Sequence, residues 1–307
     1  MGKRLLTIVL GLVFAVVLVG CGGGSEEAAN KTLVLGEQAG WPENVAVDYV
    51  TKAVLEQDFG YKEVEVKVLD LGLLFEGVAG GDLHAFLDVW LPNHEEPLAE
   101  VENDVKHLPR WYQGQTTFGL AVPDYMSDVK SIADLNESGA EEIIGIEPGA
   151  IISEQVPEHV IPEYNLKLEY KASSSAAMLK EAERLYKDKE PFVFPPWCPS
   201  THCESYAHQS PKIDYHYLKD PKNAMGNLDY GPQSDTSASI SAVVNEDLPD
   251  DDPVAFAFIK NLKLNQEELL ALENAQTKEG ALKGAKTWLK ENKDVVQPAI
   301  KAAKNAQ

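Results

Sequence analysis

The chain has 307 residues, a formal net charge of −22 and 44% hydrophobic residues. Such acidity argues against nucleic-acid binding, in which Lys and Arg neutralise phosphates, and it disfavours contact between the protein body and anionic lipid headgroups. The length and the apolar content suit one large domain or two medium domains, each with its own core.

The first twenty residues have the pattern of an export signal. Two basic residues precede an almost wholly apolar run, Leu5 to Val19, and small residues then surround Cys21. A membrane-spanning helix is the alternative, but the run is short for a bilayer. Cys21 resembles the cysteine of a bacterial lipobox, where the signal is cut before the cysteine and its sulfur carries a lipid. We therefore expect a lipoprotein signal peptide over 1–20 and a Gly-rich flexible tether over 21–31, with the protein anchored by lipid to the cell membrane, outside the cytoplasm.

The next part of the chain alternates between strand and helix patterns. A buried strand is predicted over 32–36, followed by a helix over 43–57 with apolar residues at helical spacing. A strand over 64–69, a helix over 73–79 and a strand over 83–87 follow. This is the order of βαβ units, which predicts a mostly parallel sheet.

The same alternation returns further along the chain, and helices complete it. The predicted elements are a short capped helix over 131–135, a strand over 143–146, a helix that begins in the turn 147–152, a helix over 176–187 capped by serines, strands over 191–194 and 240–244, a loop over 220–235, and helices over 253–261, 266–276 and 281–303. No long linker separates the halves. We therefore predict two α/β lobes side by side with a cleft between them.

Three tryptophans share one position relative to these predicted strands. Trp41 follows the first strand through a glycine turn, Trp90 stands at or just past the end of the strand over 83–87, and Trp197 follows the strand over 191–194. Ligands of open parallel α/β sheets bind beyond the carboxyl ends of the strands. Aromatic faces attract cations, so three of them predict a box for a quaternary ammonium group, which cannot hydrogen-bond. Taken alone, Trp90 also fits a core position.

A second feature predicts an anion site. Three cation–π contacts contribute at best about 6 kcal/mol, whereas micromolar binding needs about 8 kcal/mol. The turn Gly149-Ala150-Ile151-Ile152 opens a predicted helix, and free amides at a helix N-terminus can hold a carboxylate. A box for an ammonium group beside a nest for a carboxylate describes a zwitterion such as a betaine. An ordinary strand-to-helix connection is the alternative interpretation of this turn.

Two cysteines lie close together beside Trp197. Outside the cytoplasm, Cys198 and Cys203 are expected to form a disulfide. A zinc site with His202 and His208 is the alternative, but zinc prefers four ligands at tighter spacing, and we expect no metal. An exported enzyme with a Cys–His pair is a further alternative, which a disulfide would abolish. No other catalytic spacing is present, so we expect neither an enzyme nor a cofactor.

Six motifs of this sequence resemble the glycine betaine substrate-binding lipoproteins of ABC importers. They occur in order between about Leu33 and Val244: Gly40-Trp41-Pro42-Glu43-Asn44, Gly81-Asp82-Leu83, Asp88-Val89-Trp90-Leu91-Pro92, Gly119-Leu120-Ala121-Val122-Pro123, Gly145-Ile146-Glu147-Pro148-Gly149-Ala150, and Ser173-Ser174 through Met178. Some relatives are circularly permuted, and the order here, with the Trp41 motif first, resembles the choline-binding arrangement.

The resemblance implies an α/β, two-lobed periplasmic-binding-protein fold of type II, with the ligand cleft between the lobes. We place the first part of lobe I at 32–118, lobe II at 119–218, and the return to lobe I with the C-terminal helices at 219–307. The implied function is that of a monomeric, non-catalytic subunit that captures glycine betaine or a related quaternary-ammonium solute. It would deliver this ligand to an ABC permease with a cytoplasmic ATPase.

Carried over residue by residue, the resemblance makes Trp41, Trp90 and Trp197 the cation cage and gives the carboxylate to the amides at 150–152. This chain departs from the family at two places. Ile151 stands where the family has glycine, although a backbone amide survives that change. The run from Trp197 to Cys203 replaces Trp-Ser-Pro-His-Trp, which removes one aromatic side chain and adds two cysteines.

Two further residues have open roles at this stage. His94 is either a helper for the carboxylate or a solvated turn residue. Glu43 either faces the cation, as an acidic residue does in choline binders, or is an ordinary first-turn helix acid. Choline, carnitine, or a sulfonium or N-oxide osmolyte in the same pocket is therefore the alternative ligand, and a role as a sensor's partner is another alternative.

Overall fold

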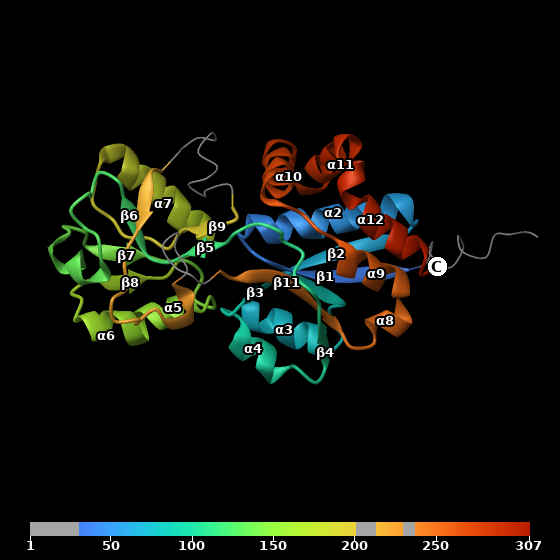
Figure 1. Ribbon diagram of the computed structural model, residues 1–307, viewed down its shortest axis with the longest axis horizontal. Coiled ribbons are helices and arrows are strands. Elements are labelled where there is room, and N and C mark those ends of the chain that lie inside the picture. The colour runs from blue at the N-terminus through green and yellow to red at the C-terminus, as the bar shows by residue number, and fades with distance from the viewer. Residues whose placement is uncertain (1–30, 201–212, 230–236) are drawn as a thin grey trace, which may run out of the picture.

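The computed structural model describes residues 31–200, 213–229 and 237–307. The predicted signal peptide, the predicted lipidation site Cys21, nearly all of the tether and Cys203 lie outside these residues. Within the described ranges, no helix is both long enough and apolar enough to cross a membrane. Figure 1 shows a mixed α/β chain in two bodies, a larger one on the right and a smaller one on the left.

The larger body is built on a five-stranded sheet of order β2-β1-β3-β11-β4. Its strands are β1 (Thr32–Gln38), β2 (Glu63–Leu69), β3 (Ala85–Leu91), β4 (Val105–His107) and β11 (Ser239–Asn245). Helix α2 (Pro42–Asp58) joins β1 to β2, and α3 (Leu71–Ala79) joins β2 to β3, so the predicted βαβ units are confirmed. Proline at the first helical position of α2 matches the fixed φ of that residue.

The predicted mostly parallel sheet is confirmed for β1, β2, β3 and β4, which run in one direction, while β11 runs against them. β1 runs parallel to β2 and to β3, whereas β11 runs antiparallel to β3 and to β4. Because β11 pairs Ile240 with Trp90 and Ser239 with Leu91, β3 continues through Leu91. Trp90 is therefore the second-last residue of β3, at the end of the strand and not past it. A cis peptide bond between Leu91 and Pro92 follows directly.

Among the described residues, the smaller body has three two-stranded sheets. β5 (Thr117–Phe118) pairs with β9 (Trp197–Cys198), β6 (Ala121–Pro123) with β10 (Tyr215–Tyr217), and β7 (Glu142–Ile144) with β8 (Glu169–Lys171). Its first and last helices are the 3-10 helix η1 (Ile132–Glu137) and α7 (Ser175–Asp188). Between them, three short helices follow one another without a break: α5 (Ile152–Gln155), the π-helix η2 (Val156–Val160) and α6 (Ile161–Tyr164).

The strand predicted over 191–194 is reduced to two isolated bridges. Val193 bridges to Ile143, and Phe194 bridges to Ala121. Prolines stand on both sides of this segment. Because proline has no N–H to donate, they prevent a longer ladder.

The other helices of the described ranges belong to the larger body, apart from the 3-10 turn η4 (Gly226–Leu228). They are α4 (Glu95–Glu100), α8 (Leu248–Asp251), α9 (Pro253–Asn261), α10 (Gln266–Glu279), α11 (Ala281–Glu291) and α12 (Lys293–Lys304). The single helix predicted over 281–303 is wrong, because Asn292 leaves helical geometry at φ −125° and ψ 28°. α10 and α11 pack on each other and on α2, while α3 lies on the opposite face of the sheet (Figure 1).

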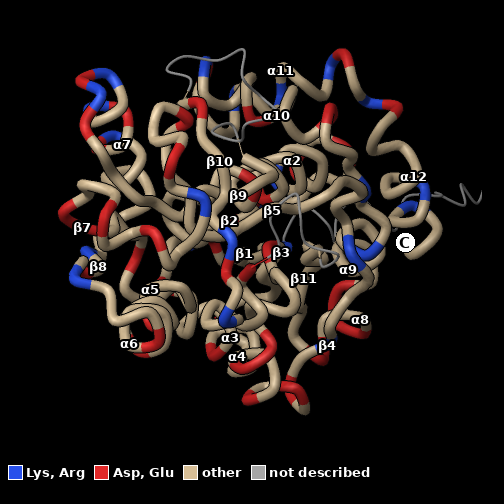
Figure 2. The backbone as a smooth tube through the Cα atoms, turned by 60° about the vertical axis from the view of Figure 1, so that its left-hand side comes forward, with Lys and Arg blue, Asp and Glu red and all other residues tan. Residues whose placement is uncertain are grey.

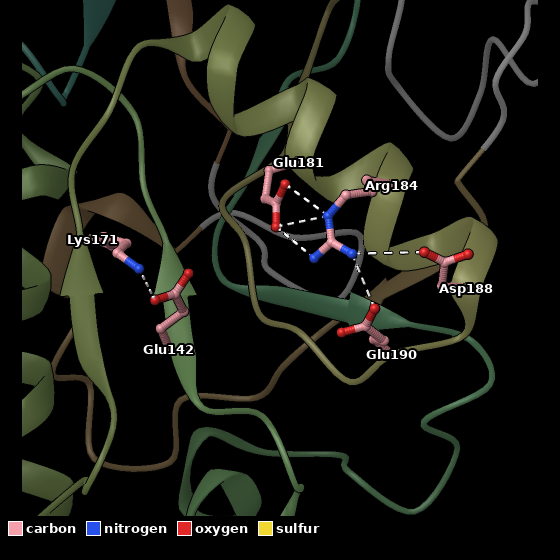
Figure 3. Close-up of polar contacts among 6 residues, drawn as sticks. All are labelled: Glu142, Lys171, Glu181, Arg184, Asp188 and Glu190. Carbon is pink, nitrogen blue, oxygen red and sulfur yellow. Dashed lines mark hydrogen bonds and ion pairs between the residues drawn. The ribbon is translucent and has the colours of Figure 1, made fainter.

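Charged residues are spread along the backbone of both bodies (Figure 2), and acidic residues predominate in the sequence, with 49 Asp and Glu against 27 Lys and Arg. A dense group of ion pairs lies on the smaller body (Figure 3). There Arg184 contacts Glu181, Asp188 and Glu190, and Lys171 contacts Glu142. These side chains are largely exposed, and such pairs contribute about 0–1 kcal/mol each. They therefore neither define the fold nor contribute to the pocket described below.

Candidate functional site

One pocket with about 420 Å³ of empty space gathers residues from both bodies. Every residue that the sequence predicted to contact a ligand lines it. The lining residues are Trp41, Glu43, Trp90, Asn93, His94, Phe118, Ile146, Ala150, Ile151, Ile152 and Trp197. The larger body supplies the start of α2 and the end of β3, and the smaller body supplies β5, β9 and the turn between β7 and α5.

One wall of the pocket is a stack of Trp41 on His94. The ring centroids lie 5.8 Å apart and the planes meet at 18°. His94 is only 2% exposed, so the interpretation of a solvated turn residue is wrong. Burial lowers the pKa of His94 to about 3, which leaves the imidazole neutral. Its Nδ1 accepts the Trp90 backbone N–H at 3.1 Å, so the ring proton is on Nε2, and Nε2–H is a donor.

The other two tryptophans are each held by their polar edge. The Trp90 Nε1–H donates to Asp88 Oδ1, and the Trp197 Nε1–H donates to Glu43 Oε1, both at 3.0 Å. Trp197 belongs to β9 of the smaller body and Glu43 to α2 of the larger one, so the second bond joins the two bodies. With their N–H groups engaged, both rings present mainly carbon surface to the pocket.

Glu43 is buried in the wall of the pocket. Although it lies in the first turn of α2, it is only 1% exposed. Burial, together with the nearby carboxyls of Asp88 and Glu273, raises the pKa of Glu43 well above its usual range. Its second oxygen, Oε2, has no hydrogen-bond partner among the described residues. A first-turn acid that only interacts with the helix dipole would be solvated, so this geometry favours a role in the pocket.

The predicted anion site lies on the smaller body, between β7 and α5. The Ala150 N–H donates to Glu147 O at 3.0 Å and is therefore already engaged. The N–H groups of Ile151 and Ile152 have no acceptor within the described part of the chain. Two of the three predicted amides are thus available to an anion in the pocket.

Tyr170 and Ser175 hold this turn in place. The Tyr170 hydroxyl accepts the Ile146 N–H at 3.1 Å and lies 2.9 Å from Ser153 Oγ. The N–H and the hydroxyl of Ser175 donate to the Glu147 carboxylate at 2.7 and 2.8 Å. These contacts connect the turn to β8 and to the start of α7.

Sequence reasoning missed three lining residues: Asn93, Phe118 and Ile146. Asn93 directly follows the Trp90-Leu91-Pro92 segment, and Phe118 directly precedes the glycine motif at 119–123. Their positions next to these motifs could therefore have identified Asn93 and Phe118 as lining residues. Phe118 is a fourth aromatic ring in the wall of the pocket.

Cys198 and the other two tryptophans of the chain do not line the pocket. Cys198 is in a disulfide, which removes it as a free nucleophile and weakens the alternative of a Cys–His enzyme. Its predicted partner Cys203, like His202 and His208, lies outside the described residues. Trp111 and Trp288 are buried and do not line the pocket.

Comparison with known proteins gives a family match over residues 31–291. The family is OpuAC, described as the substrate binding domain of the ABC-type glycine betaine transport system. A curated relative, the glycine betaine/carnitine transport binding protein GbuC of Listeria monocytogenes, is 30% identical over 170 residues. That alignment covers 53% of this chain and spans half the length of the relative.

Solved structures share the fold. Lactococcal OpuAC, closed around glycine betaine, is 26% identical with a TM-score of 0.74, covering 88% of this chain and all of that one. The glycine betaine/L-proline-binding protein ProX of Borrelia burgdorferi is 22% identical with a TM-score of 0.76, covering 90% and 100%. A choline-binding protein in complex with choline is 21% identical with a TM-score of 0.74, covering 92% and 99%. The predicted two-lobed periplasmic-binding-protein fold is therefore confirmed.

Proposed function

Because the chain belongs to the family of substrate-binding domains of ABC-type glycine betaine transport systems, we propose that its pocket captures glycine betaine. Trp41, Trp90 and Trp197, hereafter the cage, surround the quaternary ammonium group. The chain is thus a solute-binding component of an importer and not an enzyme.

The observation that carries this proposal is the convergence of the cage and the free amides on one pocket. The three rings come from the start of α2, from β3 and from β9, and the amides come from the turn before α5. Cation–π contacts contribute about 0.5–2 kcal/mol each. Charge-assisted hydrogen bonds contribute about 1.5–3 kcal/mol each. Together these terms reach the roughly 8 kcal/mol that micromolar binding requires.

On the carboxylate side, we narrow the proposed donors to the amides of Ile151 and Ile152 and the Nε2–H of His94. The Ala150 amide, which the sequence also predicted, keeps its bond to Glu147 O. His94 qualifies because it is buried, is neutral and has a defined tautomer. A neutral donor can serve a carboxylate without adding a positive charge beside the ammonium group.

A panel of ligands tests the proposal. The measurement is the melting temperature of the protein with glycine betaine, proline betaine, choline, carnitine or trimethylamine N-oxide, followed by titration calorimetry of the ligands that stabilise it. We expect glycine betaine to give the largest stabilisation, because a bound ligand stabilises in proportion to ln(1 + [L]/Kd). No stabilisation by any quaternary ammonium compound would refute the proposal.

Choline is the second candidate, and one observation favours it. Glu43 lines the pocket next to the cage and holds Trp197, so an acidic group faces the region proposed for the cation. A ligand without a carboxylate would use that group and leave the amides of Ile151 and Ile152 to water. Stronger stabilisation by choline than by glycine betaine in the same panel would establish this alternative.

The His94→Asn variant separates the two ligands. Asparagine can still accept the Trp90 N–H through Oδ1, but it loses the Nε2–H donor. We expect glycine betaine affinity to fall about tenfold, the equivalent of about 1.4 kcal/mol for one hydrogen bond to a charged group. Choline, which has no carboxylate, should lose less than about threefold. Calorimetry on both ligands measures the difference, and equal losses would argue against a carboxylate at His94.

The remaining features of the proposal concern the whole protein. We propose a monomer, attached to the membrane by a lipid on Cys21, that delivers its ligand to a permease with a cytoplasmic ATPase. We also propose the lobe boundaries 32–118, 119–218 and 219–307, with Cys198 paired to Cys203. The Trp197–Glu43 bond between the two bodies supports closure of the lobes around the ligand.

A further inference from the structure

Three buried carboxyl groups interact behind the cage, and two of them do not line the pocket. Glu43 comes from α2, Asp88 from β3 and Glu273 from α10, and they are 1%, 0% and 2% exposed. Each interacts electrostatically with at least one other member. We call these three residues the carboxyl cluster.

No positive charge compensates the carboxyl cluster within the described part of the chain. Glu43 Oε2, Asp88 Oδ2 and both carboxyl oxygens of Glu273 lack a hydrogen-bond partner there. The described residues include no group of His, Cys, Asp or Glu arranged to hold a metal ion. Uncompensated buried carboxylates are costly, so the cluster keeps protons that solvated carboxyls would lose.

The neighbouring titratable groups do not supply the missing charge. Glu37 on β1 and Asp48 on α2 are acidic, and the pKa of each is raised by burial. Tyr49 on α2 faces those two carboxyls, and its pKa is raised as well. His94, after β3, is neutral because burial lowers its pKa. The whole region is therefore acidic or neutral.

Two direct hydrogen bonds connect this cluster to the cage. Asp88 accepts the Trp90 indole N–H, and Glu43 accepts the Trp197 indole N–H. Glu273 has no such bond, but it interacts with both carboxyls. A negative charge on the cluster would attract a cation in the cage directly, in surroundings of low dielectric constant. It would repel a carboxylate on the same ligand.

We propose that Asp88 and Glu273 are specificity-determining residues that act together with Glu43 behind the cage. The three carboxyls share protons, and the charge left on them sets how strongly the cage prefers a ligand of net positive charge over a zwitterion. This inference rests on the proposed function, because it requires a quaternary ammonium group in the cage. Choline and glycine betaine are the two ligands that it distinguishes.

The direction of the pH dependence follows from burial. Desolvation raises the pKa of Asp88 and of Glu273 to about 8, and the pKa of Glu43 lies well above its usual range. As the pH rises through this range the cluster ionises, and a bound cation favours the ionised form. Choline binding should therefore release protons and tighten as the pH rises. Glycine betaine should gain less, because its carboxylate is repelled by the same charge.

The experiment is calorimetric titration of choline and of glycine betaine at about pH 6, 7, 8 and 9, in two buffers of different ionisation enthalpy. For the wild-type protein we expect the ratio of the two affinities to shift toward choline at least about fivefold between the extremes. The buffer dependence of the heat should show proton release on choline binding. An affinity ratio that does not change with pH would overturn the inference.

The Glu273→Gln variant identifies the contribution of the cluster. Because Glu273 raises the pKa of Glu43, its removal should let Glu43 ionise at lower pH and move the shift toward choline to lower pH. Glu267→Gln, on the exposed face of the same helix, should keep the wild-type profile. A Glu273→Gln profile identical to the wild type would contradict the role of Glu273. If this variant does not fold, the wild-type titrations decide the inference alone.

A ligand-free measurement completes the test. A carboxyl whose pKa is raised in the folded state contributes stability at low pH that is lost as the pH rises toward the folded pKa. The melting temperature of the ligand-free wild type should therefore fall from about pH 6 to about pH 9, and less so in Glu273→Gln. Binding of neither ligand would refute the proposed function. Binding of both with an unchanged affinity ratio would refute only this inference.

Discussion

The Trp90→Ala variant is expected to bind glycine betaine at least tenfold more weakly than the wild type. The substitution removes one ring of the cage, worth about 0.5–2 kcal/mol as a cation–π contact. It also removes the donor to Asp88 Oδ1, so a buried carboxyl behind the cage loses its hydrogen-bond partner. Tenfold corresponds to about 1.4 kcal/mol, which these two losses together should exceed. Titration calorimetry measures the change.

Trp111→Ala is the matched control for this substitution. Both tryptophans are buried, at 4% and 3% exposure, and the Trp111 Nε1–H donates to Leu87 O of β3. Removal of a buried Trp side chain costs about 3–5 kcal/mol of stability, so both variants should melt at lower temperature while circular dichroism shows that they remain folded. Only Trp90 lines the pocket. Wild-type affinity in Trp90→Ala, or an equal loss in Trp111→Ala, would refute the assignment of the cage.

The parts of the fold that could be predicted are those encoded locally. The alternation of strand and helix from β1 to β3 follows from hydrophobic spacing, and the first turn of α2 follows from Pro42. Helix α9 begins at Pro253, with the Asp252 side chain as its cap, and it matches its predicted bounds. In these segments the residues that specify an element lie inside it or next to it.

The errors arise where a distant segment or a weak break decides the structure. β3 extends to Leu91 because β11, almost 150 positions later, pairs with its end, and local spacing carries no trace of that partner. The predicted strand stopped at residue 87, whereas β3 continues through the buried Asp88, whose carboxyl accepts the Trp90 indole N–H. The break between α11 and α12 occurs at Asn292, where no glycine or proline is present to predict the end of a helix.

At the site, the residues that line the pocket could be predicted from the sequence, whereas the buried residues behind them could not. The three tryptophans of the cage and the turn at 150–152 lie in motifs, His94 lies just after one, and all of them line the pocket. The burial of Glu273 could not be predicted, because an acidic residue in a helix is expected to face solvent. Its burial depends on how α10 packs against α2 and the sheet. The sequence pattern of α10 alone does not show how closely this helix approaches its neighbours, but a substitution at the contact between α10 and α11 can test it.

Gly284→Ala is expected to lower the free energy of unfolding by at least about 2 kcal/mol, because the added methyl group would clash with backbone atoms, which cannot move aside as a flexible side chain can. Gly284 lies in α11 where a Cβ would come within 2.4 Å of Gln276 N and Cα in α10. The two helices would have to separate there, one turn from Glu273, so the carboxyl cluster should be disturbed as well.

Gly72→Ala in α3 is the control for this substitution. Nothing lies within 4 Å of a Cβ added there, so we expect the free energy of unfolding to rise by up to about 1 kcal/mol. Chemical denaturation measures both, and equal stability of the two variants would show that the approach of α10 to α11 is not close.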